Sequence, residues 1–314
     1  MAVAGILNIP KLPLFSSLPL RKRLRSLSIS IKASNSQTST KEEENPSFSS
    51  SSSSSSTTRT ATTFAPPPNF KPPEPKPFAI RPDKTWDVVG ASLALFFRLG
   101  TGVFVSGLEG ERDIEDRPSS GEAYRDIRVR RVREIVAVLD IDVLFYPCPK
   151  NGPNFRPKVA QMGGKQQFPY MVDPNTGVAM YESDDIIKYL VEKYGDGSVP
   201  FMLSLGLLTT LTAGFAMIGR MGRGNSYTPS KLPPKPLEIW SYEGSPFCKI
   251  IREVLVELEL PHIQRSCARG SPKRQILYEK AGHFQVPYLE DPNTGVQMFE
   301  SAEIVEYLRA TYAQ

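Results

Sequence analysis

The chain has 314 residues, with 38 Lys and Arg against 33 Asp and Glu, 29 Pro, 22 Gly, 3 Cys and 2 His. Three cysteines exclude a disulfide-rich secreted scaffold, and two isolated histidines argue against a structural zinc site. Because much of the net charge of +5 lies near the N-terminus, the charge gives no indication of nucleic-acid binding. After the first 84 residues, enough chain remains for two small domains.

The first 40 residues have the composition of a targeting sequence. Residues 1–40 contain six basic residues, many serines and no acidic residue. This is typical of an organelle transit peptide, and the interrupting prolines favour the plastid over the mitochondrion. A disordered basic tail without a targeting role is the alternative. Residues 41–84, with eight consecutive serines at 49–56 and a proline-rich stretch, are expected to be a disordered linker.

Two apolar stretches, at 85–110 and 197–221, are expected to be helices. The second contains 21 residues without a charge at 199–219, which is long enough to span a bilayer. The first carries Asp87 and Arg98, which are unfavourable in lipid. The alternative is that both are connector helices that pack on neighbouring domains, so membrane association stays open.

An internal repeat organises the rest of the chain. Residues 167–190 and 285–308 share the pattern PYxxDPNTGVxMxES. The similarity continues upstream, where the offset changes from 118 to 119 residues, as a one-residue deletion would produce. The chain is therefore expected to contain two copies of one domain, copy one at 122–196 and copy two at 236–314.

Copy two shows the expected elements most clearly. An apolar strand at 237–242 is followed by a helix that Ser245 caps and whose apolar residues recur at helical spacing. The further elements are a strand at 262–267, a helix near 271–282, antiparallel strands at 286–289 and 296–299, and a last helix from Ser301. Because a βαβ crossover makes its two strands parallel, the order βαβ-ββα predicts an α/β fold with a mixed sheet.

Three motifs of copy two together carry a family resemblance. They are Ser245-Pro-Phe-Cys248 before and within the first helix, Val286-Pro287, and Glu300-Ser301 at the start of the last helix. This set resembles the thioredoxin-like N-terminal domain of glutathione transferases and the glutaredoxins. The resemblance covers nearly all of copy two and most of copy one. A tandem pair of such domains behind a plastid-type leader is similar to plant plastid proteins of this family. This resemblance implies two thioredoxin-like domains.

The resemblance implies glutathione as ligand or cosubstrate. Ser245 at a helix N-terminus would stabilise the glutathione thiolate, and Cys248 would be a nearby thiol, either catalytic or merely structural. Val286 and Pro287, at the position where the family has a cis peptide bond, would hold the cysteinyl backbone. Glu300 and Ser301 would bind the γ-glutamyl end, unless Ser301 only caps its helix.

Copy one departs from this pattern at its beginning. Asp126 stands where copy two has Ser245, and residues 118–123 read PSSGEA, which has no strand-like character. We therefore expect copy one to lack its first strand and its active-site motif. The charged stretch 109–131 reflects either a degenerate repeat or an aberrant splice or gene model.

Taken together, these patterns predict a glutathione-binding protein with a thiol-transfer or redox role in the chloroplast, in the stroma or at the thylakoid or envelope membrane, acting on protein thiols. A redox pair of Cys248 and Cys267 is conceivable at the shared strand edge. Conjugation of a bulky electrophile is not expected, because no large helical domain follows copy two in this sequence. The alternative function is a non-catalytic, membrane-associated scaffold or interaction protein that uses the same fold.

Overall fold

The computed structural model describes residues 64–76, 80–98, 100–106, 118–122, 127–205, 211–212, 220 and 223–314. The predicted transit peptide and the serine run lie outside the described residues. The described residues belong to one compact unit.

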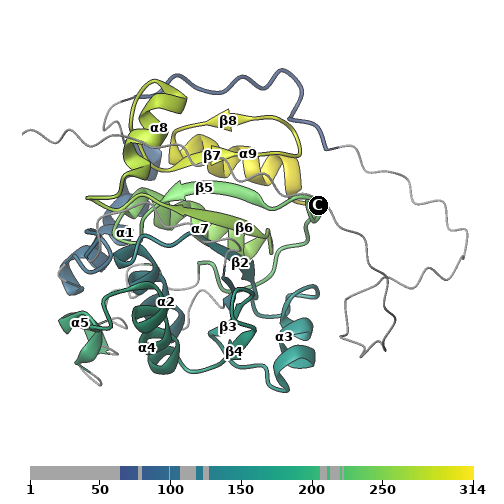
Figure 1. Ribbon diagram of the computed structural model, residues 1–314. Coiled ribbons are helices and arrows are strands. Elements are labelled where there is room, and N and C mark those ends of the chain that lie inside the picture. Colours follow the sequence, from purple (N-terminus) through teal and green to yellow (C-terminus); the bar gives the residue numbers. More distant parts are fainter. Residues whose placement is uncertain are drawn as a thin grey trace, which may run out of the picture. The chain divides into compact units, whose positions relative to one another are not determined.

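Copy two folds as its sequence predicts. Its elements are β5 (Leu237–Ser241), α7 (Pro246–Glu257), β6 (His262–Ser266), α8 (Lys273–Ala281), β7 (Tyr288–Glu290), β8 (Gln297–Met298) and α9 (Ser301–Tyr312). β5 pairs parallel with β6 and antiparallel with β7, as a βαβ-ββα unit requires. Ile239 and Leu289 point into the core under α7 and α9, whereas Trp240 and Tyr288 contact α8 on the opposite face. The sheet is therefore covered on both faces (Figure 1).

Copy one has the same order of elements. They are β1 (Ser119–Glu122), α2 (Ile127–Val138), β2 (Val143–Pro147), α3 (Arg156–Gly163), β3 (Tyr170–Asp173), β4 (Val178–Met180) and α4 (Ser183–Tyr194). The prediction that copy one lacks its first strand, and so begins only at residue 122, is wrong. β1 lies between β2 and β3 and pairs with both. Its small residues suit this central place: a Cβ on Gly121 would lie 2.9 Å from Val159 Cγ2. Tertiary pairing here outweighs the low strand propensity of the sequence.

The two copies join into one eight-stranded sheet through an antiparallel pairing of β2 with β6, in the order β4-β3-β1-β2-β6-β5-β7-β8. Leu144 pairs with Ile263, which is its own equivalent in the repeat. The flanking pairs, Val143 with Gln264 and Phe145 with His262, are equivalent to each other. The junction is therefore self-complementary, like the isologous interface of a twofold dimer.

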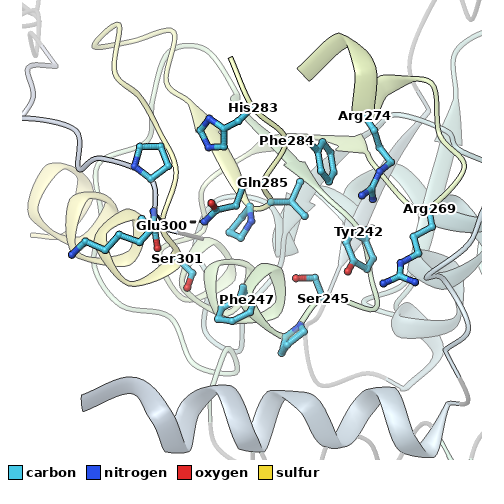
Figure 2. Close-up of a pocket in the computed structure, with 15 residues that line it drawn as sticks. Tyr242, Ser245, Phe247, Arg269, Arg274, His283, Phe284, Gln285, Glu300 and Ser301 are labelled. Carbon is cyan, nitrogen blue, oxygen red and sulfur yellow. Dashed lines mark hydrogen bonds between the residues drawn. The ribbon is translucent and has the colours of Figure 1, made fainter. Parts of the chain in front are cut away.

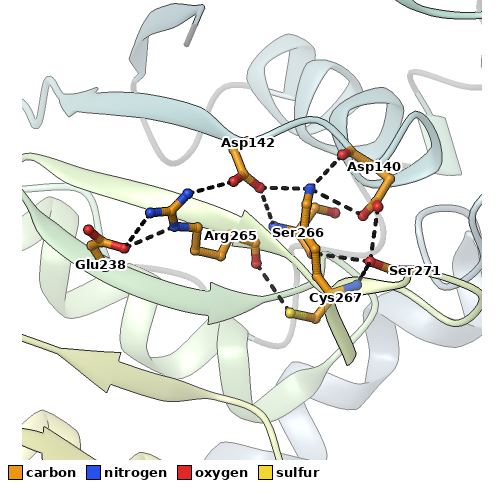
Figure 3. A network of polar contacts seen from close by, with 8 residues as sticks. Asp140, Asp142, Glu238, Arg265, Ser266, Cys267 and Ser271 are labelled. Atoms are coloured by element: carbon orange, nitrogen blue, oxygen red, sulfur yellow. Dashed lines mark hydrogen bonds and ion pairs between the residues drawn. The ribbon is translucent and has the colours of Figure 1, made fainter. Parts of the chain in front are cut away.

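Reciprocal polar contacts close this junction. From copy one, Asp142 accepts hydrogen bonds from Arg265 Nη1 (2.9 Å) and Lys273 Nζ (2.8 Å), and Asp140 accepts one from Ser271 Oγ (2.9 Å; Figure 3). Burial raises the pKa of Asp140, against the opposing effect of Lys273. From copy two, Glu259 accepts hydrogen bonds from the backbone of copy one, including Phe155 N at 2.9 Å. Asp140 and Glu259 are equivalent in the repeat, so each copy holds the loop of the other.

Charged side chains are buried where α2 and α7 approach this junction. The carboxylate of Glu243 forms ion pairs with Arg252 Nη1 at 2.7 Å and with Arg133 Nε at 3.3 Å. Burial opposes ionisation of Glu243, but the two guanidinium groups hold its pKa below the usual value. Lys249 is also buried, and burial together with Arg130 lowers its pKa to about 7.

The connectors differ from their predictions. Within the helix expected at 85–110, the structure has α1 (Thr85–Phe97), after which Gly100 and Gly102 have φ values of 75° and 81°. The chain then runs extended, and Val105 N donates to Arg269 O at 2.9 Å. In the helix expected at 197–221, the structure describes α5 (Phe201–Ser204) and a helical pair at 211–212, and the rest lies mostly outside the described residues. No helix in the described ranges is long and apolar enough to cross a membrane.

The linker expected to be disordered at 41–84 is ordered in part. Residues 64–76, here called the N-terminal strap, lie along copy two. The ring of Phe64 lies 5.4 Å from that of Tyr312, and the ring of Phe70 lies 5.0 Å from that of Tyr307. Two aromatic anchors therefore order a proline-rich segment whose composition otherwise indicates disorder.

The depressed pKa of Lys249 makes stability depend on pH. Between pH 7 and the usual lysine value of 10.5, the unfolded chain binds a proton that the folded chain does not. The free energy of unfolding should therefore gain a contribution that rises with pH in this window. Lys249→Met should remove this contribution, so urea unfolding followed by circular dichroism should show a flatter pH dependence. Lys188→Met, on the exposed side of α4, is the control; equal slopes for wild type and Lys249→Met would contradict the assignment.

Candidate functional site

Copy two contains a pocket of about 810 Å³ between the N-termini of α7 and α9, the loop before β7 and the N-terminal strap. Figure 2 shows an elongated arrangement. Glu300 and Ser301 lie at one end, and Arg269 and Arg274 lie at the other. Ser245 lies between the two ends. The pocket therefore offers an acid and a helix N-terminus on one side and two guanidinium groups on the other.

The structure brings together five of the six site residues predicted from the sequence. These pocket-lining residues are Ser245, Val286, Pro287, Glu300 and Ser301. The peptide bond between Val286 and Pro287 is cis, as is the equivalent bond between Phe168 and Pro169 in copy one. Cys248 is not among the residues that line the pocket.

Ser245 combines a structural role with access to the pocket. Its Oγ accepts a hydrogen bond from Cys248 N at 3.3 Å and so caps α7, and Pro246 occupies the first helical position. A hydroxyl that accepts from the helix can still donate its own proton to an anion in the pocket. The α7 N-terminus adds a favourable electrostatic field for such an anion.

The cysteines near the site are buried. Cys248 is 2% exposed, and burial raises its pKa, which favours the thiol over the reactive thiolate. Cys267 is fully buried, and burial raises its pKa strongly. Its Sγ lies 3.6 Å from Arg265 O, as Cys148 Sγ lies 3.4 Å from Tyr146 O in copy one. Cys148 and Cys267 therefore occupy equivalent packing positions, and the predicted catalytic role of Cys248 stays a prediction that its burial does not favour.

Glu300 is held in place by two donors. Its Oε1 accepts hydrogen bonds from Gln285 Nε2 at 2.9 Å and from the backbone N of Lys76 at 2.7 Å. Glu300 precedes α9 with a φ of 71°, and Glu182 in copy one has a φ of 64° and accepts a hydrogen bond from Gln167. The glutamine–glutamate contact thus belongs to the repeat.

The basic end of the pocket is absent from the sequence predictions. Arg274 stacks on Phe284, with its guanidinium carbon 3.8 Å from the ring centroid, and donates to Cys267 O at 3.3 Å. Burial raises the pKa of Tyr242, and Arg269 and Arg274 act against this rise. A signal existed: both arginines follow the second strand, whose end shares the sheet edge with Ser245 in a parallel pair.

In copy one, an arginine side chain contacts Ser183, the equivalent of Ser301. Arg131 Nη1 donates to Ser183 Oγ at 3.2 Å, and its Nη2 donates to Leu203 O at 3.2 Å and pairs with Asp184. In copy two the residue equivalent to Arg131 is Ile250, which leaves Ser301 lining an open pocket. Asp126, at the position of Ser245, lies outside the described residues. Among the described residues, Arg131 therefore occupies the surroundings of Ser183 that in copy two open into the pocket.

Two segments of the chain match one protein family. Residues 128–198 and 240–314 both match the family of the glutathione S-transferase N-terminal domain. The chain carries two glutathione S-transferase N-terminal domains in tandem. This confirms the thioredoxin-like α/β fold expected for both copies. Domains of this family generally bind glutathione, which points to a thiol-related function. The comparison with curated proteins gave no match.

The burial of the three cysteines predicts slow modification in the native protein. Iodoacetamide should label Cys148, Cys248 and Cys267 much more slowly in the folded chain than in urea, because a buried neutral thiol reacts poorly. Peptide mass spectrometry would measure each site. Ser245→Cys is the positive control, since a thiol there faces the pocket at a helix N-terminus and should react faster than Cys248. Fast native labelling of Cys248 would contradict this view of the site.

Proposed function

We propose that copy two binds glutathione in this pocket and that the protein uses it for glutathione-dependent thiol transfer in the plastid. The observation that carries the proposal is the order of groups along the pocket: acid and helix N-terminus, capping hydroxyl, then two arginines. Glutathione presents an amino-acid head, a thiol and a terminal carboxylate in the same order. Copy one would serve as a scaffold.

The head of glutathione fits the Glu300 end. The carboxylate of Glu300 would accept from the α-ammonium group of the γ-glutamyl residue. Ser301 and the free N–H groups of α9 would bind the adjacent α-carboxylate, since a helix N-terminus favours an anion. Val286, whose backbone precedes Pro287, would pair with the cysteinyl backbone.

The thiol and the tail fit the rest of the pocket. The cysteinyl sulfur would lie at the α7 N-terminus, where Ser245 can donate to a thiolate. Arg274, and with it Arg269, would bind the glycyl carboxylate through charge-assisted hydrogen bonds.

The chemical step would use the sulfur of glutathione itself. A serine hydroxyl cannot form a mixed disulfide, and Cys248 is buried. The bound glutathione thiolate would attack a protein–glutathione mixed disulfide at the glutathione sulfur, forming glutathione disulfide and releasing the protein thiolate. In this step the protein disulfide is reduced and glutathione is oxidised, with Ser245 stabilising the attacking thiolate.

A non-catalytic interaction module is the second candidate. The observation in its favour is that, in copy one, Arg131 contacts Ser183 and Asp184 at the position where copy two has its pocket. If neither copy binds a ligand, both domains would act through their surfaces.

Glutathione binding can be measured with a matched pair of variants. Isothermal titration of the full chain should give one saturable site. Ser301→Ala should weaken binding about 10-fold, because it removes a hydrogen bond to a charged group. Ser183→Ala removes the equivalent hydroxyl of copy one and should leave the affinity unchanged. Absence of binding at millimolar glutathione, or an equal effect of both variants, would rule out the proposed site.

The plastid location can be tested separately. Residues 1–63 fused to a fluorescent protein should be imported by isolated chloroplasts and shortened by processing, because an acid-free, serine-rich basic leader is what such import recognises. The same fusion with all six basic residues of 1–40 replaced by Gln is the control. Import of the control, or exclusion of the unaltered fusion, would count against a transit peptide.

A further inference from the structure

We propose that the N-terminal strap, residues 64–76, completes the ligand site of copy two, with the backbone N–H of Lys76 positioning Glu300. The proposal rests on glutathione as the ligand of copy two. The strap lies outside both segments that match the family. It acts on the end of the pocket that would bind the γ-glutamyl head.

The strap is anchored to α9 on both sides of the site. On the N-terminal side of Lys76, Phe64 and Phe70 pack on Tyr312 and Tyr307. On its C-terminal side, Arg81 Nη1 forms ion pairs with Glu306 at 2.8 Å and with Glu303 at 3.4 Å. The strap and Arg81 therefore both contact α9, one on each side of Lys76 in the sequence.

The contact at Glu300 is direct. Lys76 N donates to Glu300 Oε1 at 2.7 Å, and Pro75 and Lys76 line the pocket. Gln285 donates to the same oxygen, as Gln167 does to Glu182 in copy one. Among the described residues, no backbone donor from a preceding segment reaches Glu182. The Lys76 contact therefore distinguishes the carboxylate of copy two from that of copy one.

A carboxylate fixed by two donors presents its remaining lone pairs in one direction. An ammonium group that binds it gains a preoriented partner, since the side chain loses less rotational freedom on binding. The prolines of the strap restrict its backbone before the ligand arrives, which lowers the cost of ordering it further. Lys76 is thus a positioning residue for recognition of the γ-glutamyl ammonium group.

One substitution removes the hydrogen bond from Lys76 N to Glu300 and is expected to change little else. Lys76→Pro deletes the backbone N–H within a stretch that already reads Pro-Lys-Pro, where an extended proline fits. Lys76→Ala removes the side chain and keeps the N–H. Titration of glutathione into the full chain should show about 5-fold weaker binding for Lys76→Pro than for Lys76→Ala, because both variants lack the lysine side chain and only Lys76→Pro lacks the backbone N–H.

A second ligand separates positioning from general damage. Glutaryl-cysteinylglycine differs from glutathione by the loss of the α-amino group alone. Wild type should bind it more weakly than glutathione, and Lys76→Pro and Lys76→Ala should bind it equally, because the group that Glu300 recognises is absent. A general loss of structure would weaken both ligands equally, and that result would overturn the positioning role.

The remaining outcomes are distinguishable. If wild type binds glutathione and Lys76→Pro binds it as tightly as Lys76→Ala or more tightly, the strap does not position Glu300 and the proposed function stands. If wild type binds no glutathione, the proposed function fails, and the assignment of the strap to a glutathione site fails with it.

Discussion

The antiparallel pairing of β2 with β6 is the contact on which the other features depend. Each of these strands would otherwise be the exposed edge of a four-stranded sheet, with unpaired backbone groups open to another chain. Because Leu144 pairs with its own repeat equivalent, Ile263, the junction relates the copies by an approximate twofold axis. The same axis brings α2 and α7 together and buries charged residues between them, such as Lys249 and Glu243, which then require partners.

Copy one supports the pocket of copy two without contributing to its lining. Asp140 and Asp142 bind Ser271, Lys273 and Arg265, which flank the loop that carries Arg269. The extended stretch after α1 also holds this loop, because Val105 N donates a hydrogen bond to Arg269 O. The basic end of the pocket is therefore held by segments outside copy two. This gives a physical reason for copy one in the chain: its contacts hold part of the pocket of copy two in place.

Much of this arrangement could be predicted from the sequence. The repeat, the element order of copy two and the cap at Ser245 follow from local patterns of spacing and polarity, which act within a few residues. The strand β1 could not be predicted, because its pairing with β2 and β3 decides its conformation and SSGE carries no strand signal. The ordered strap could not be predicted either, since two phenylalanines in a proline-rich segment find partners only in the folded domain.

The residues of the site differ in the same way: local motifs predict some of them, and tertiary contacts position the others. Ser245, the Val286-Pro287 bond and Glu300-Ser301 were predictable because each motif is read within a few residues of a strand or helix end. Arg274 has a weaker signal, its place after the second strand, and its exact position depends on stacking with Phe284 and on the carbonyl of Cys267. The strap contact from Lys76 comes from more than two hundred residues away. Family motifs thus identify the part of the pocket that lies at strand and helix ends. The groups that close its two ends come from α8 and its preceding loop and from the N-terminal segment, and their positions depend on tertiary contacts. Selectivity for one thiol ligand over another would therefore lie mainly in the parts of this chain that the motifs do not describe.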